Sequence, residues 1–95
     1  MFIISLTYQV PLDIVDTYIE EHVTYLEEQY SAGNFMASGR KEPRTGGVIL
    51  AKGECLSDIE KIIEKDPFKK QGVANYEVIE FTPSKTSKEL AFLLS

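Results

Sequence analysis

The order in which strand-like and helix-like segments follow one another constrains the fold of this chain more than any other feature. Segments rich in β-branched and aromatic residues favour strands, and apolar residues at three- and four-residue steps favour helices. Six such segments occur in the order strand–helix–strand–strand–helix–strand, at residues 1–8, 11–32, 35–39, 48–52, 57–66 and 76–81. This order predicts an α+β, ferredoxin-like βαββαβ fold, in which a four-stranded antiparallel sheet carries two helices on one face.

Capping signals indicate where the two helices begin and end. Pro11 fits the first turn of the long helix, and Gly33-Asn34 is expected to end it. Ser57 and Glu60 predict a capping box at the start of the second helix, and Asp66-Pro67 is expected to end that helix. The buried stripe of the long helix is predicted from its apolar positions, which are Leu12, Val15, Ile19, Val23, Leu26 and Tyr30.

Length and charge narrow the class of protein. The 95 residues suffice for one domain, and 15 acidic against 10 basic residues give a net charge of −5. This charge disfavours nonspecific binding to nucleic acid or to an anionic membrane surface, since both need a dense basic face. No apolar run approaches the ~20 residues of a membrane span, and the first residues do not resemble a signal peptide. With a single cysteine and no targeting signal, the chain is expected in the cytoplasm.

The third predicted strand, within 48–51, is apolar on both of its faces. Because side chains alternate along a strand, Ile3 and either Val78 or Ile79 also have to point away from the helices. A sheet that is apolar on its open face needs a cover, and a second subunit is the simplest one. We therefore predict a homodimer.

The only histidine of the chain, His22, is a candidate general acid–base. It is expected at the edge of the apolar stripe of the long helix, flanked at helical spacing by Tyr18 and Tyr25. An imidazole titrates near neutral pH, which suits proton transfer. The same spacing fits a partly buried histidine that is satisfied by one hydrogen bond, and judged by spacing alone this structural interpretation is the commoner one.

Asp66 is expected at the C-terminal end of the second helix, where the helix dipole disfavours a carboxylate. One interpretation is that Asp66 accepts a hydrogen bond from His22 and supports the imidazolium ion, as in triad-type sites. The other is that Asp-Pro is only a helix stop and turn signal. The sequence does not decide between them, because it does not show whether the two side chains touch.

Positive charge gathers in the connection between the second and third strands. Arg40, Lys41 and Arg44 lie close to Gly39, and a guanidinium beside open backbone amides suits a carboxylate or phosphate group. Such a cluster is more often a solvated hairpin loop. One histidine and one cysteine without ligand spacing predict no metal site, and Cys55 is interpreted as a structural thiol.

Three short motifs in the right order resemble those of the YciI-like domain family, a group of ferredoxin-like dimeric α/β barrels. They are His22-Val23-Thr24-Tyr25-Leu26, Gly33-Asn34-Phe35-Met36-Ala37-Ser38-Gly39 and Asp66-Pro67-Phe68. The resemblance covers residues 1–82 and leaves 83–95 as a C-terminal tail with the composition of a short helix. The chain departs from the family pattern in two places. Ile19 stands where arginine is frequent, and the proline that commonly follows the strand glycine is displaced to Pro43.

The resemblance implies a dimer with packed sheets and a catalytic His22–Asp66 pair beside a small cleft. We expect cofactor-independent acid–base chemistry on a small anionic or aromatic molecule, bound by Gly39, Arg40 and Arg44. The alternative is a non-catalytic homodimer that binds a small molecule or another protein. A protein-interaction module predicts an exposed apolar patch in the tail, around Leu90, Leu93 and Leu94.

Overall fold

A computed structural model describes residues 1–94 and contains the expected order of elements. The elements are β1 (Phe2–Tyr8), α1 (Leu12–Ser31), β2 (Phe35–Arg40), β3 (Gly46–Ala51), α2 (Leu56–Ile63), α3 (Pro67–Lys70), β4 (Ala74–Glu80) and a terminal 3-10 helix, η1 (Lys88–Leu94). The one-turn helix α3 is an addition to the predicted set. It lies between α2 and β4, and it carries much of the candidate site described below.

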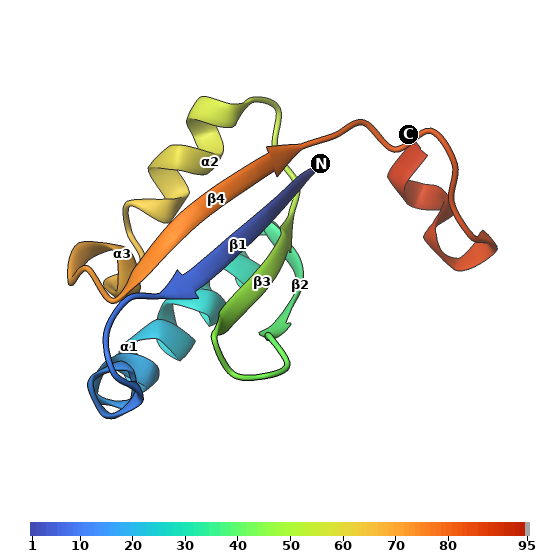
Figure 1. Cartoon of the computed structure of the whole chain (residues 1–95). Coiled ribbons are helices and arrows are strands. Elements are labelled where there is room, and N and C mark those ends of the chain that lie inside the picture. Colours follow the sequence, from blue (N-terminus) through green and yellow to red (C-terminus); the bar gives the residue numbers. More distant parts are fainter. Residues whose placement is uncertain (95) are drawn as a thin grey trace.

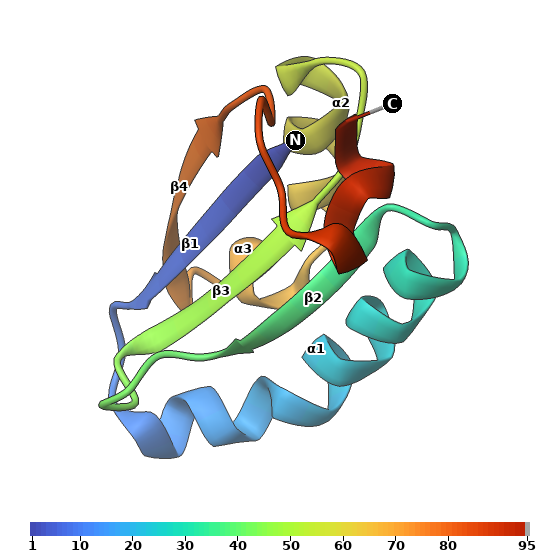
Figure 2. The same ribbon diagram turned by 90° about the vertical axis from the view of Figure 1, so that its right-hand side faces the viewer.

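The four strands form one antiparallel sheet in the order β2-β3-β1-β4. Helices α1, α2 and α3 cover one face of this sheet, and the other face carries no helix of the domain itself (Figures 1 and 2). The predicted ferredoxin-like α+β fold is therefore confirmed.

The core lies between the sheet and the helices. Alternate residues of β1, which are Phe2, Ile4 and Leu6, point into it and are at most 2% exposed. They pack in one cluster with Ile59 of α2 and Phe68 of α3. Burying each such side chain stabilises the fold by about 1.5–3 kcal/mol, so β1, α2 and α3 are held together by the same contacts.

The buried face of α1 differs from the predicted stripe. Leu12, Val23 and Tyr30 are between 38% and 44% exposed, whereas His22 and Gln29 are buried. Taking 3.6 residues per turn, the buried face is rotated by roughly 80° from the apolar stripe. Helix α3 packs against α1, and the hydrogen bond to Asp66 draws His22 inward. Gln29 instead accepts a hydrogen bond from Asn34, just after the end of α1. His22 consequently lies within the buried face and not at its edge.

The predicted start and end of the second helix are wrong. Helix α2 begins at Leu56 with no side-chain cap, so Ser57 and Glu60 do not form a capping box. It ends at Ile63, and Asp66 is instead the N-cap of α3, where its carboxylate accepts a hydrogen bond from the backbone N–H of Phe68. Because proline fits the first turn of a helix, Asp-Pro begins a helix here. A carboxylate at this position is favoured, contrary to the expectation from the sequence.

The open face of the sheet is apolar over part of its area, as predicted, although Ser5 and Glu77 lie on it as well. Ile3 pairs with Leu50 and Ile79 on this face, and Val48 and Ile79 are 40% and 48% exposed. Val78 packs against the core, so Ile79 is the residue of that pair which points away from the helices. Within residues 1–94, no helix is long and apolar enough to cross a membrane.

The C-terminal tail leaves β4 and stands on the side of the open face, away from the helices (Figure 1). Its predicted short helix is present as the 3-10 helix η1, and Phe92, Leu93 and Leu94 line a shallow pocket together with Met1 and Met36. The tail therefore approaches its own domain at one end of the sheet only. Its apolar side chains remain largely exposed, including Leu90 at 47% and Leu94 at 50%.

Candidate active site

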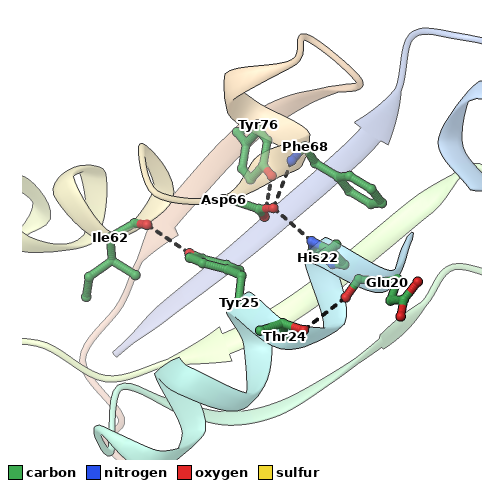
Figure 3. Close-up of polar contacts among 8 residues, drawn as sticks. All are labelled: Glu20, His22, Thr24, Tyr25, Ile62, Asp66, Phe68 and Tyr76. Carbon is green, nitrogen blue, oxygen red and sulfur yellow. Dashed lines mark hydrogen bonds and ion pairs between the residues drawn. The ribbon is translucent and has the colours of Figure 1, made fainter. Parts of the chain in front are cut away.

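The imidazole of His22 contacts the carboxylate of Asp66 in the interior of the domain. Nδ1 of His22, in the middle of α1, lies 2.8 Å from Oδ1 of Asp66, at the start of α3 (Figure 3). The Asp66 side chain is fully buried and the His22 side chain is 11% exposed. The two residues are 44 positions apart, so only the packing of α1 against α3 brings them together.

The carboxylate of Asp66 accepts three hydrogen bonds. Besides Nδ1 of His22, the backbone N–H of Phe68 donates to Oδ1 at 3.0 Å, and the hydroxyl of Tyr76 donates to Oδ2 at 2.5 Å (Figure 3). A carboxylate only accepts, so the neutral imidazole bonded to it carries its proton on Nδ1. These contacts offset the cost of burying the carboxylate and fix which imidazole nitrogen is left unprotonated.

The other imidazole nitrogen, Nε2, is open to the surroundings. It has no hydrogen-bond partner in the described chain, and no buried side-chain nitrogen or oxygen within residues 1–94 lacks a partner. Nε2 therefore reaches solvent, and His22 lines a cavity between α1 and the β2–β3 hairpin. An unprotonated nitrogen that reaches solvent, on an imidazole held by a buried carboxylate, is suited to taking up a proton.

Aromatic rings fix the plane of the imidazole. The ring of Phe68 lies parallel to it, with 4.0 Å between centroids and 2° between planes. The ring of Tyr25 lies 6.2 Å away at 29°, and its hydroxyl donates to the carbonyl oxygen of Ile62 at 2.8 Å (Figure 3). Helix α3 thus supplies both the carboxylate and the stacked ring, so a single turn of helix sets the position of His22.

The cavity has a volume of about 210 Å³. Its walls are mostly apolar, and the lining residues with polar side chains are Tyr8, His22, Ser38 and Arg40. Its β3 side is close to β1: a Cβ on Gly46 would lie 1.8 Å from the carbonyl oxygen of Leu6, so only glycine fits there. The cavity is shaped for a small molecule that packs against apolar walls and meets a few polar side chains.

The structure brings Gly39 and Arg40 to the cavity with His22, whereas Arg44 is not among the lining residues. Arg40 is 69% exposed and lies 3.6 Å from Glu42, a loose contact that leaves the guanidinium available. Arg44 instead donates to Asp16 at 2.5 Å, and this hydrogen bond raises its pKa. Its guanidinium lies 6.0 Å from the ring centroid of Tyr8, which lines the cavity.

Tyr25 and Tyr76 are buried phenols next to the site. Burial raises the pKa of both hydroxyls, and the nearby carboxylate of Asp66 raises each pKa further. The hydroxyl of Tyr76 thus remains a hydrogen-bond donor to Asp66 throughout the neutral range.

Within residues 1–94, no three His, Cys, Asp or Glu side chains form a group that could hold a metal ion.

A comparison with protein-family models matches the YCII-related domain over residues 1–82. The chain belongs to this family. A solved structure with a similar fold is 5-chloro-2-hydroxyhydroquinone dehydrochlorinase from Burkholderia phenoliruptrix AC1100, in complex with 2,5-dihydroxybenzoquinone. Its TM-score is 0.72 at 20% identity, over 94% of this chain and 98% of that one. Among curated proteins, a search with the sequence finds no match.

Proposed function

We propose that this YCII-related protein is a cofactor-independent enzyme in which His22 transfers a proton and Asp66 holds the imidazole. The observation that carries the proposal is the contrast between the two imidazole nitrogens. Nδ1 is bonded to a fully buried carboxylate, whereas Nε2 has no partner and reaches solvent, on a side chain that lines the cavity. In such an arrangement the carboxylate stabilises the imidazolium ion that forms when Nε2 accepts a proton.

In the proposed reaction, Nε2 accepts a proton from a hydroxyl or an activated C–H group of the substrate. Asp66 remains ionised and faces the resulting charge on the imidazolium ion. His22 then returns the proton to another atom of the substrate or to a leaving group, which restores the neutral imidazole. Both steps are proton transfers by one side chain.

The size of the cavity supports a substrate with a single ring. An engineered apolar cavity of ~150 Å³ holds benzene, so a cavity of about 210 Å³ admits a benzene ring with a few small substituents. Arg40 at the rim suits an anionic substituent, with Gly39 leaving space beside it. Arg44 would contribute to binding indirectly, through Tyr8, which lines the cavity and whose ring centroid lies 6.0 Å from the Arg44 guanidinium. The similar dehydrochlorinase, bound to 2,5-dihydroxybenzoquinone, offers a ring compound of this size as a probe.

A homodimer in the cytoplasm is part of the proposal. The open face of the sheet exposes Val48 and Ile79, and a second copy on this face would bury both. The single thiol, Cys55, is exposed, which suits a reducing compartment.

One observation favours the alternative, a non-catalytic binding protein. The His22 side chain is only 11% exposed and stacks against the ring of Phe68, so little of the imidazole is accessible to a ligand. A histidine held in this way could serve as a single hydrogen-bonding group for a bound ligand. Binding without turnover is the result that this alternative predicts.

The proposal is tested with 2,5-dihydroxybenzoquinone in deuterium oxide. Acid–base catalysis predicts that the ring hydrogens of this probe exchange with solvent faster with the protein than with the His22→Gln variant, as followed by NMR. Binding with no difference in exchange between the two proteins would favour the binding module. If the probe neither binds nor exchanges, the proposed substrate class is wrong.

A further inference from the structure

The two carboxyl oxygens of Asp66 have different partners. Oδ1 accepts from both Nδ1 of His22 and the backbone N–H of Phe68, whereas Oδ2 accepts from the hydroxyl of Tyr76 (Figure 3). We propose that Tyr76 is a positioning residue of the site, which holds the Asp66 carboxylate so that Oδ1 faces His22. This inference rests on the proposed function, since it concerns how the carboxylate of Asp66 is kept aligned with the imidazole of His22.

The geometry supports a positioning role because three separate elements meet at one carboxylate. Tyr76 lies on β4, Asp66 begins α3 and His22 lies in α1. The phenol–carboxylate distance of 2.5 Å is typical of a strong, charge-assisted hydrogen bond. Without it, one buried oxygen of Asp66 would lack a partner, and the carboxyl group could rotate to share its remaining donors between both oxygens.

The surroundings of Tyr76 keep its hydroxyl directed at Asp66. Tyr76 pairs with Leu6 across the β1–β4 ladder, which fixes the backbone from which the ring projects. On the outer side, Lys69 of α3 lies with its ammonium group 5.8 Å from the ring centroid. Burial raises the pKa of the phenol, so this donor is not lost to ionisation near neutral pH.

A merely structural tyrosine would stabilise the fold without affecting the imidazole. The tautomer of His22 distinguishes the structural role from the positioning role. The ¹⁵N chemical shifts of the two ring nitrogens report this tautomer directly. The chain has one histidine, so tag-free protein labelled with ¹⁵N-histidine gives a single pair of signals. The wild type should show protonated Nδ1 and unprotonated Nε2 in the neutral form.

The variant to compare is Tyr76→Phe, with Tyr25→Phe as the matched control. The control removes another tyrosine hydroxyl bond in the same core, the one to the carbonyl oxygen of Ile62, without touching Asp66. A positioning role predicts a mixture of tautomers in Tyr76→Phe, the wild-type tautomer in Tyr25→Phe, and exchange of the probe slowed about tenfold in Tyr76→Phe. A wild-type tautomer with an unchanged pH profile of exchange in Tyr76→Phe overturns the inference.

The outcome for Tyr76 is distinct from the outcome for the proposed function. If the wild type exchanges no probe but Tyr76→Phe still alters the tautomer, the positioning role holds and the enzyme proposal fails. If Tyr76→Phe does not fold, 3-fluorotyrosine placed at position 76 keeps the ring and makes the hydroxyl a stronger donor. It should shift the ¹⁵N signals of His22, and unchanged signals would contradict the positioning role.

Discussion

The ring of Phe68 lies parallel to the imidazole of His22 at a centroid distance of 4.0 Å, two residues after the carboxylate that binds the same imidazole. The segment Asp66-Pro67-Phe68 therefore contacts His22 twice, once at an edge and once on a face. Its own backbone N–H also secures Asp66. A tripeptide at the start of a one-turn helix thus determines both the orientation and the protonation pattern of the candidate catalytic group.

Removing the Phe68 ring should weaken the fold and release the imidazole. Phe68 is 1% exposed, so Phe68→Ala is expected to lower the free energy of unfolding by about 3–5 kcal/mol. Urea unfolding followed by circular dichroism measures this change. Val23→Ala, on the exposed side of α1, is the control and should stay within about 0.5 kcal/mol of wild type. Similar losses in both variants would contradict the assigned core.

Replacing Asp66 by asparagine should remove the charge that supports an imidazolium ion at His22. Oδ1 of Asp66 accepts from both Nδ1 of His22 and the backbone N–H of Phe68, so the amide oxygen of Asp66→Asn is expected to take this place, with its N–H₂ group facing the hydroxyl of Tyr76. The Nδ1–H tautomer is then kept, but exchange of the probe is expected to fall by about a hundredfold, because no negative charge stabilises the imidazolium ion. Histidine ¹⁵N spectra and exchange rates measure the two effects. Full exchange in Asp66→Asn would show that the charge of Asp66 does not support His22.

Stability should decline at alkaline pH because of the two buried phenols. The pKa values of Tyr25 and Tyr76 are raised above 10, so the unfolded chain loses these protons first and the folded state binds more protons. This stability is complete below about pH 10 and falls above it, by at most about 1.4 kcal/mol per pH unit for each phenol. Urea titrations between pH 8 and 11 measure the slope. Tyr76→Phe should reduce the slope, and an equal slope in both proteins would argue against the raised pKa.

A charge on the open face of the sheet should prevent association. Ile79 is 48% exposed in the isolated chain. Ile79→Lys would place an ammonium group where a second copy would pack. Sedimentation analysis should find wild-type dimers and Ile79→Lys monomers with unchanged circular dichroism. Val23→Lys, at a similarly exposed position on α1, is the control and should remain dimeric. A monomeric wild type would refute the homodimer.

Arg40 and Arg44 should differ in their effect on ligand binding. Arg40 lines the cavity, so Arg40→Ala is expected to raise the Kd of an anionic ring compound by about tenfold, equivalent to about 1.4 kcal/mol. Arg44 is engaged with Asp16, and Arg44→Ala should change the Kd by less than about threefold. Calorimetric titration with an anionic probe and its neutral analogue measures both. A loss that is equal for the two probes would exclude charge recognition by Arg40.

The sequence predicts the fold because local patterns and the order of elements agree. It predicts the buried face of α1 less well, because an apolar stripe cannot reveal that His22 is drawn inward by a hydrogen bond to another helix. The position of Asp66 was misjudged because Asp-Pro can end one helix or begin the next. Contact between His22 and Asp66 depends on tertiary packing, and no local pattern encodes it.

Tyr76 was missed, although a signal for it exists. It occupies the same face of β4 as Ala74 and Val78, which pack into the core, and a tyrosine that points into a core needs a partner for its hydroxyl. Alternation along the strand therefore indicated an inward phenol. Which acceptor it would meet could not be predicted, because that acceptor lies on a helix that the sequence pattern did not reveal.

Val48 lines the cavity and also projects from the exposed face of the sheet. A second subunit packed on that face would share this wall with any molecule bound inside. Occupancy of the cavity and assembly of the protein would then be thermodynamically linked, each altering the free energy of the other. The apparent ligand affinity of such a protein depends on its own concentration, so dilution alone can regulate the site.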